Sequence, residues 1–157
     1  MRDIALASMG SGALIIENNK VLLVRLNYGP AKGKFILPGG MVEKDEHPHE
    51  ACIRELKEET GLTGEVISQI SVRHRIETNG RLNIYWVFKC KNLSPAETKL
   101  IPQEGEIQEV VFMDIDKALS NDDVRFHTKE FIKIGLNQTV DKIIKFEYPD
   151  KIDVVYI

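Results

Sequence analysis

The sequence contains few cysteines and no long hydrophobic run. Its 2 cysteines, Cys52 and Cys90, are too few for a disulfide framework and lack the spacing of a zinc site. We therefore expect both to be small buried residues. No apolar run approaches the roughly 18 residues of a membrane span, and the first residues do not resemble a secretory signal. These absences predict a cytoplasmic protein that does not cross a membrane.

An excess of positive charge is also missing. Lys and Arg total 21 against 24 Asp and Glu, so the formal net charge is -3. A chain that binds nucleic acid through bulk charge would be basic. We expect no stable nucleic acid complex, and any phosphate must be recognised by local groups. The length of 157 residues and the 43% hydrophobic content suit a single domain over residues 1–157 with one core.

Short apolar runs separated by turn residues dominate the first forty positions. Residues 4–26 predict a β-hairpin whose turn contains Asn18 and Asn19, which tolerate positive φ. Residues 27–34 are basic and turn-rich, which indicates an exposed loop. A short apolar segment at 35–37 and a turn at 38–40 follow.

The remaining segments alternate helical and extended patterns. Residues 48–60 predict a helix, with Pro48 at its first position and Gly61 just past its end. Asn79-Gly80 is a hairpin signal. The other expected elements are strands at 65–75, 81–91 and 109–114, a loop at 92–108, a helical turn at 115–119, a helix at 123–134 and a hairpin at 142–157 around Pro149-Asp150.

The helix at 48–60 has an unfavourable arrangement of charge. Glu55, Glu58 and Glu59 lie at i, i+3 and i+4 and share one face, near the helix end where the macrodipole disfavours anions. We expect the opposite face to pack on a sheet through Ile53, Leu56 and Thr60. Such a cluster is either an ordinary solvated face or a site where Mg²⁺, which prefers oxygen ligands, compensates the repulsion.

A longer pattern surrounds these glutamates. From Gly40 the chain has five residues and Glu46, then seven residues and Arg54-Glu55-Leu56, Lys57, Glu58-Glu59, Thr60 and Gly61-Leu62. This segment resembles the Nudix box, G-x5-E-x7-R-E-U-x-E-E-x-G-U with U aliphatic, at every specified position. The resemblance implies the α/β class, as the Nudix-type α/β/α sandwich with a mixed β-sheet.

The resemblance also implies roles for individual residues. Glu58 and Glu59 correspond to metal-binding carboxylates and the Gly39 carbonyl to a backbone ligand, for Mg²⁺ or Mn²⁺. Glu55 corresponds to a residue that binds metal or activates water. Arg54 corresponds to the arginine that orients this carboxylate, with Glu46 as its partner. The alternative for this arginine is an ordinary i,i+4 surface pair with Glu50.

A further carboxylate of the site is expected in a downstream loop. Many Nudix relatives place a base or metal ligand there, and Glu104 and Glu106 precede the strand expected at 109–114. Glu104, as base or ligand, is our first choice and Glu106 the second. The alternative is that both are solvated loop residues.

Substrate phosphates also require cations. Arg25 and Lys34, close in sequence to Gly39 and Gly40, are predicted phosphate contacts, and we include Gly40 among the substrate-binding residues. Solvated surface roles are the alternative for both cations. Tyr28 and Tyr85 could stack a nucleobase, although Tyr85 lies in a strand-like pattern that favours core packing. His47 and His49 lack a third metal ligand and suit the start of the helix.

The resemblance implies a hydrolase that cleaves the diphosphate of a nucleoside diphosphate linked to another group X. Nucleoside triphosphates, nucleotide sugars and ADP-ribose remain open, because the marks of individual branches are absent. The alternative is a non-catalytic module that senses a nucleotide, although this chain keeps all four box glutamates. The expected partner is a small nucleotide, and a homodimer is consistent with the family.

Overall fold

The computed structural model describes residues 4–137 with their side chains, and the backbone of residues 143–148 and 151–156. The described residues form a six-stranded sheet in the order β5-β1-β7-β6-β10-β9. These strands are β1 (Ala7–Leu14), β5 (Gly39–Met41), β6 (Gly64–Ile76), β7 (Leu82–Asn92), β9 (Ile143–Tyr148) and β10 (Lys151–Tyr156). The sheet is mixed, because β1 and β7 are parallel and the other pairs are antiparallel.

A second, four-stranded sheet lies beside the first. It contains β2 (Ile16–Glu17), β3 (Lys20–Leu26), β4 (Phe35–Ile36) and β8 (Ile107–Asp114), with β3 paired to each of the other three. The hairpin expected over residues 4–26 is confirmed only for β2 and β3, where Asn18 and Asn19 have φ values of 49° and 61°. The earlier residues form β1, which pairs with β5 and β7 in the other sheet. The chain passes from one sheet to the other between β1 and β2.

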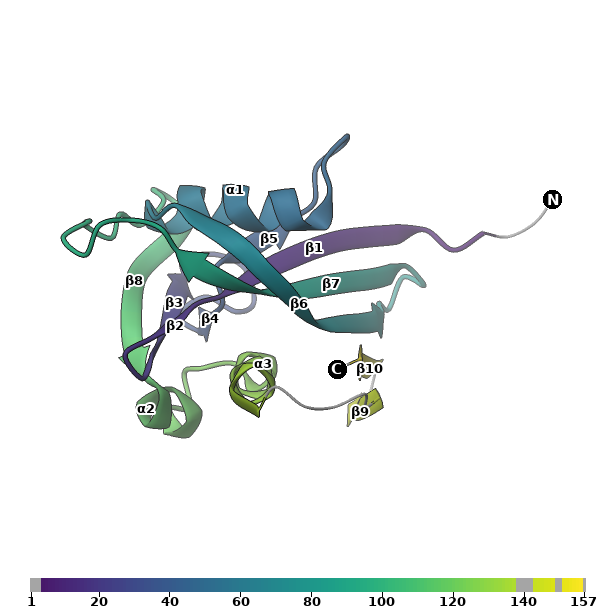
Figure 1. The fold of residues 1–157 in the computed structure, drawn as a ribbon. Coiled ribbons are helices and arrows are strands. Elements are labelled where there is room, and N and C mark those ends of the chain that lie inside the picture. Colours follow the sequence, from purple (N-terminus) through teal and green to yellow (C-terminus); the bar gives the residue numbers. More distant parts are fainter. Residues whose placement is uncertain (1–3, 138–142, 149–150, 157) are drawn as a thin grey trace.

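Helices cover both faces of the six-stranded sheet (Figure 1). The α1 helix (Pro48–Thr60) lies on one side, and α3 (Phe126–Asn137), preceded by α2 (Ile115–Ser120), lies on the other. The expected α/β/α sandwich with a mixed sheet is therefore confirmed. In the described part of the chain, no helix has the length and apolar character needed to cross a membrane.

Alternating side chains of β1 contribute to both core layers. Ala13 packs with Leu56 of α1, whereas Leu14 packs with Phe131 of α3, as the two-residue period of a strand requires. Cys52 and Cys90 are both buried on the α1 side, with their sulfur atoms 3.7 Å apart. Their expected role as small core residues is confirmed.

The helix at 48–60 has the predicted bounds. Gly61 ends it in the left-handed conformation, with φ 78°. The Asn79-Gly80 hairpin joins β6 and β7, as predicted. The buried face, however, includes Glu59, which we had placed with Glu55 and Glu58 on the acidic face, whereas Ile53 is only partly buried.

Three other predictions about the secondary structure were wrong. Gly39 and Gly40 do not form a turn, because they belong to β5 and pair with Gly12 and Ser11 of β1. The loop at 92–108 ends earlier, where β8 begins. The last helix starts three residues later than predicted. The Asp123 carbonyl accepts a hydrogen bond from the Phe35 N–H, so it pairs with a distant strand and not with a following turn of helix.

The expected C-terminal hairpin is present in the backbone of β9 and β10. Its turn, Pro149-Asp150, lies outside the described residues. Because β10 pairs with β6, this hairpin extends the sheet of its own chain.

Candidate active site

Arg54 of α1 connects three carboxylates. Its Nε and Nη2 atoms donate to the two oxygens of Glu46 at 2.8 and 3.0 Å. Its Nη1 atom donates to Glu55 at 2.8 Å and to Glu58 at 3.2 Å. A further bond, from Nη2 to the Met41 carbonyl at 2.9 Å, links the arginine to β5. The predicted Arg54–Glu46 pairing is therefore present in the structure.

The alternative pairing of Arg54 with Glu50 is not what the structure shows. Glu50 instead accepts a hydrogen bond from the backbone N–H of His47 at 2.8 Å, at the start of α1. The bidentate contact with Arg54, together with the Glu43 N–H, holds the pKa of Glu46 below its usual value. Glu46 therefore stays ionised and fixes the orientation of the arginine.

Glu59 lies on the buried face of α1. It is 2% exposed, and its Oε2 atom accepts a hydrogen bond from the Gly39 N–H at 2.8 Å. Burial, followed by repulsion from Glu55, Glu106 and Glu58, raises its pKa to about 8, despite the bond from Gly39. A buried carboxylate with this pKa has too little positive charge around it.

Glu55 lies directly against β5. A Cβ atom at Gly40 would collide with its carboxylate, so only glycine permits this approach. Burial, followed by repulsion from Glu58 and Glu106, raises the pKa of Glu55, and the Arg54 contact opposes the rise. Glu58 is the most exposed of these carboxylates, with 45% of its side chain accessible.

The downstream loop approaches this cluster through Glu106. The charge of Glu106 contributes to the raised pKa of both Glu55 and Glu59, whereas Glu104 is not among the causes of either shift. The Asn27 N–H donates to the Glu106 carbonyl at 2.8 Å and thereby ties this loop to the segment after β3. The charge that acts on Glu55 and Glu59 is therefore that of our second choice, Glu106.

The predicted metal ligands supply only oxygen atoms. As the side chains stand, no three His, Cys, Asp or Glu residues of the described chain are grouped to hold a metal ion. Arg54 and the Gly39 N–H occupy oxygens of the three helix glutamates. The donor set nevertheless fits a hard divalent cation, because burial and then repulsion from neighbouring glutamates raise the pKa of Glu59, and such an ion would oppose both effects.

The predicted phosphate contacts have other partners. Arg25 donates to the Gly33 carbonyl at 2.9 Å and lies over the ring of Phe35. Lys34 forms an ion pair of 2.9 Å with Asp123, and Arg25 lies 3.6 Å from the same carboxylate. The Lys34 contact, together with the charge of Arg25, lowers the pKa of Asp123. Both cations thus stabilise the loop, and their phosphate role remains a prediction.

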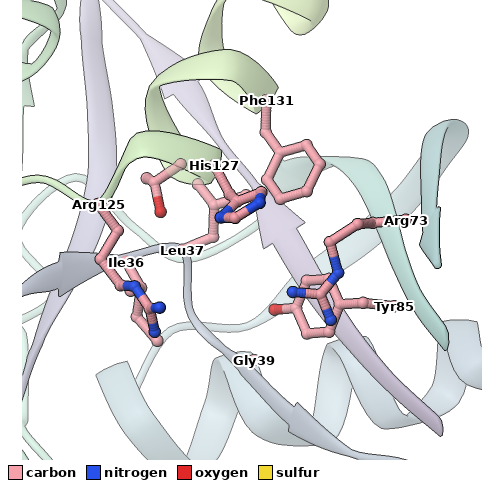
Figure 2. A pocket seen from close by; sticks show the side chains of 9 residues that line it. Ile36, Leu37, Gly39, Arg73, Tyr85, Arg125, His127 and Phe131 are labelled. Atoms are coloured by element: carbon pink, nitrogen blue, oxygen red, sulfur yellow. The ribbon is translucent and has the colours of Figure 1, made fainter. Parts of the chain in front are cut away.

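A pocket begins at Gly39 and extends along the α3 side of the sheet (Figure 2). It has a volume of about 150 Å³. Tyr85 contributes to its wall, as predicted for a packed residue, since its ring packs near Phe131 with centroids 6.4 Å apart. The other lining residues are Ile36, Leu37, Arg73, Arg125, His127 and Thr128.

Sequence reasoning missed the cations of this pocket. Arg73 faces Tyr85 across the β6–β7 ladder and its guanidinium lies over the tyrosine ring. A two-residue turn at Asn79-Gly80 would pair Arg73 with Trp86, one residue away from the observed partner Tyr85. The hairpin signal therefore gives the wrong register for this contact. Arg125 and His127 come from the chain before and at the start of α3, and no spacing rule relates them to the box.

Comparison with known proteins identifies the family of this chain. The sequence profile described as NUDIX domain matches residues 8–133. The chain therefore belongs to the NUDIX family. It is 49% identical over 59 residues to "ADP-ribose pyrophosphatase" of Methanocaldococcus jannaschii, a match that covers 38% of this chain and 35% of that protein. It is 33% identical over 109 residues to "Nudix hydrolase 2" of Arabidopsis thaliana, covering 67% and 38%.

Solved structures share the fold. The MutT protein from Methanosarcina mazei Go1 superposes with a TM-score of 0.70 at 24% identity, covering 87% of this chain and 98% of that one. A UDP-X diphosphatase superposes with a TM-score of 0.67 at 26% identity, covering 88% and 67%. The chain spans well under two thirds of the length of the curated relatives named above.

Proposed function

We propose that this chain is a metal-dependent pyrophosphohydrolase acting on a nucleoside diphosphate linked to a group X. The observation that supports this most directly is the arrangement around Arg54, which holds Glu46, Glu55 and Glu58 in one network beside buried Glu59. Such repulsion is tolerated where a cation binds.

In this proposal, Glu58, Glu59 and the Gly39 carbonyl hold Mg²⁺ or Mn²⁺, with Glu55 as a further ligand or as the base. The bound ion would neutralise phosphate charge and lower the pKa of water. Arg54, fixed by Glu46, positions the carboxylate of Glu55. Because its pKa is raised, Glu55 is suited to accept a proton from the attacking water.

Glu106 is the loop carboxylate that we now propose as the additional base or ligand, because its charge acts on both Glu55 and Glu59. Glu104 stays a prediction that a matched variant can test. Gly40 contributes by its small size, since it lets β5 approach Glu55.

Relatives suggest the substrate class. The matches include proteins named ADP-ribose pyrophosphatase from Methanocaldococcus jannaschii and Bacillus subtilis, so we propose ADP-ribose, nucleotide sugars and nucleoside triphosphates as the first candidates. We further propose a cytoplasmic location and no stable nucleic acid complex, which the net charge of -3 supports.

The test is chromatographic detection of the nucleoside monophosphate and of the product that carries X, because cleavage within the diphosphate releases no free phosphate. A nucleotide panel is incubated with millimolar Mg²⁺ or Mn²⁺, with and without a chelator. We expect products cleaved at the diphosphate for at least one class, and loss of turnover in chelator. Tight nucleotide binding without turnover under every metal condition would instead identify a nucleotide sensor and overturn the proposal.

A further inference from the structure

A larger hollow adjoins the pocket that begins at Gly39. The second hollow has a volume of about 640 Å³ and shares Arg125 and His127 with the first. Lys34, Arg75 and Phe126 are among its other lining residues. We call the two together the Arg125 groove. It runs from the β5 strand, whose Gly39 contacts Glu59, to the exposed chain before α3.

The groove differs from the rest of the surface in its polar groups. Among the described residues that line the smaller pocket, the polar side chains are Arg73, Tyr85, Arg125, His127 and Thr128, and none is a carboxylate or a carboxamide. The described lining of the larger hollow adds one carboxylate, Asp122. The lining is therefore rich in hydrogen-bond donors, with Lys34 already paired to Asp123, although the whole chain has a net charge of -3.

Arg125 is the strongest indication of a ligand. Its backbone is fixed at both ends, because its N–H donates to the Phe35 carbonyl at 3.1 Å and its carbonyl accepts from the Lys129 N–H at 3.1 Å. Its guanidinium has no carboxylate at ion-pair distance within the described part of the chain, unlike Arg25 and Lys34, which contact Asp123.

Figure 2 shows how this side chain is presented. Arg125 lies beside Ile36 on one side of the pocket, and Arg73 lies on the other side, over the Tyr85 ring. A planar guanidinium presents donors in a fork that matches phosphate oxygens in a bidentate contact. Arg125 is exposed, so its guanidinium is accessible to such a group.

We infer that the Arg125 groove binds a phosphate group of the substrate that lies outside the cleaved diphosphate. The preferred substrates are then nucleoside diphosphate derivatives with one additional phosphate, either on the nucleoside ribose or on group X. This inference rests on the proposed function, which sets the orientation of the substrate. It adds a preference between substrates that the residues of the Nudix box do not determine.

The first test measures binding without turnover. Calorimetry in chelator compares pairs that differ by one phosphate: ADP-ribose with its 2′-phosphate, dephospho-coenzyme A with coenzyme A, and UDP-glucose with its 6-phosphate. The first two pairs place the extra phosphate on the nucleoside, and the third places it on X. We expect at least ~10-fold tighter binding of the phosphorylated member in one arm, decreasing at high ionic strength.

Two variants test whether Arg125 is responsible for the preference for the phosphorylated member. Arg125→Gln should reduce the preference to less than ~3-fold, with the unphosphorylated member changed less than ~2-fold. Lys117→Gln removes one exposed positive charge on α2, outside the groove lining, and should preserve the preference. Equal binding within all three pairs, or an equal loss for both members in Arg125→Gln, would overturn the inference.

Turnover separates this inference from the proposed function. If the proposal holds, kcat/KM with Mg²⁺ shows the same preference as binding, and Arg125→Gln removes it. A preference in binding with no hydrolysis of any pair would contradict the enzymatic proposal and leave the groove assignment supported. Hydrolysis with no preference in any arm would contradict the groove assignment alone.

Discussion

The two faces of the six-stranded sheet have opposite chemistry. On the α1 side, Glu55, Glu58 and Glu59 repel one another and are held by Arg54 and the Gly39 N–H. On the α3 side, the Arg125 groove presents hydrogen-bond donors with aromatic walls. The faces meet at β5, which contacts both. The acidic face suits a cation and the groove suits an anion, so together they suit a metal-bound phosphate compound.

The two faces also differ in which parts of the chain form them. The acidic residues come from one helix and the turn before it, and local spacing places them together. The groove combines β6, β7 and the chain before α3, which only the tertiary fold brings together. The predictions below separate the contributions of the two faces.

The largest effect is expected on the acidic face. Glu58→Gln removes one negative charge from the proposed metal site and should lower kcat at least ~10²-fold while the fold is retained. Steady-state kinetics and thermal unfolding measure this. The control, Glu97→Gln, changes an exposed loop carboxylate and should keep wild-type turnover. Full activity of a folded Glu58→Gln protein would remove the acidic face from the mechanism.

Arg54→Lys should lower kcat/KM by ~10- to 100-fold. Lysine keeps the charge but cannot form the bidentate contact with Glu46 and also bind Glu55 and Glu58. The apparent Mg²⁺ affinity in activity titrations should change as well. Activity near wild type would show that charge alone, without the arginine geometry, organises this face.

The loop glutamates give a matched pair. Glu106→Gln should lower kcat by ~10-fold or more, and Glu104→Gln by less than ~2-fold, because the Glu106 charge acts on Glu55 and Glu59. The reverse order would restore our original choice of Glu104.

A pH series tests the burial of Glu59. Burial raises its pKa from 4.5 to about 8, so the folded state holds the proton more tightly than the unfolded state. This stabilising contribution is complete below pH 4.5 and is lost as pH rises through about 8. In chelator, urea unfolding of wild type should therefore show stability that falls between about pH 5 and about pH 9 relative to Glu59→Gln. If the stabilities of wild type and Glu59→Gln changed with pH in parallel, the proposed effect of burial on the pKa of Glu59 would be contradicted.

The smallest effect is expected at Arg25. Arg25→Lys keeps the charge but loses the hydrogen bond to Gly33 and the contact with Phe35. We expect a loss of about 1 kcal/mol in the free energy of unfolding and a change in kcat/KM of less than ~3-fold. A loss of ~10-fold or more in kcat/KM, with stability unchanged, would support our original phosphate contact instead.

The sequence predicted the acidic face in detail. The helix bounds and the end at Gly61 follow from local residue patterns. The Nudix resemblance follows from the spacing of the box over residues 40–62, and this resemblance implied the Arg54–Glu46 contact that the structure contains. It placed Glu59 on one face with Glu55 and Glu58 and not on the buried face, because the box pattern does not show which side of the helix meets β5. It also treated Gly39-Gly40 as a turn, because pairing with β1 is a long-range contact.

What the sequence by itself determined is therefore the family and the set of acidic residues, because helical periodicity fixes neighbours three and four residues apart. The tertiary structure alone decided that Glu59 is buried, that the charge of Glu106 acts on Glu55 and Glu59, and that Arg73 and Arg125 share a pocket with Gly39. These relations depend on strand order and on the return of the chain at α3. Neither leaves a signal at short spacing, so only the assembled fold reveals them.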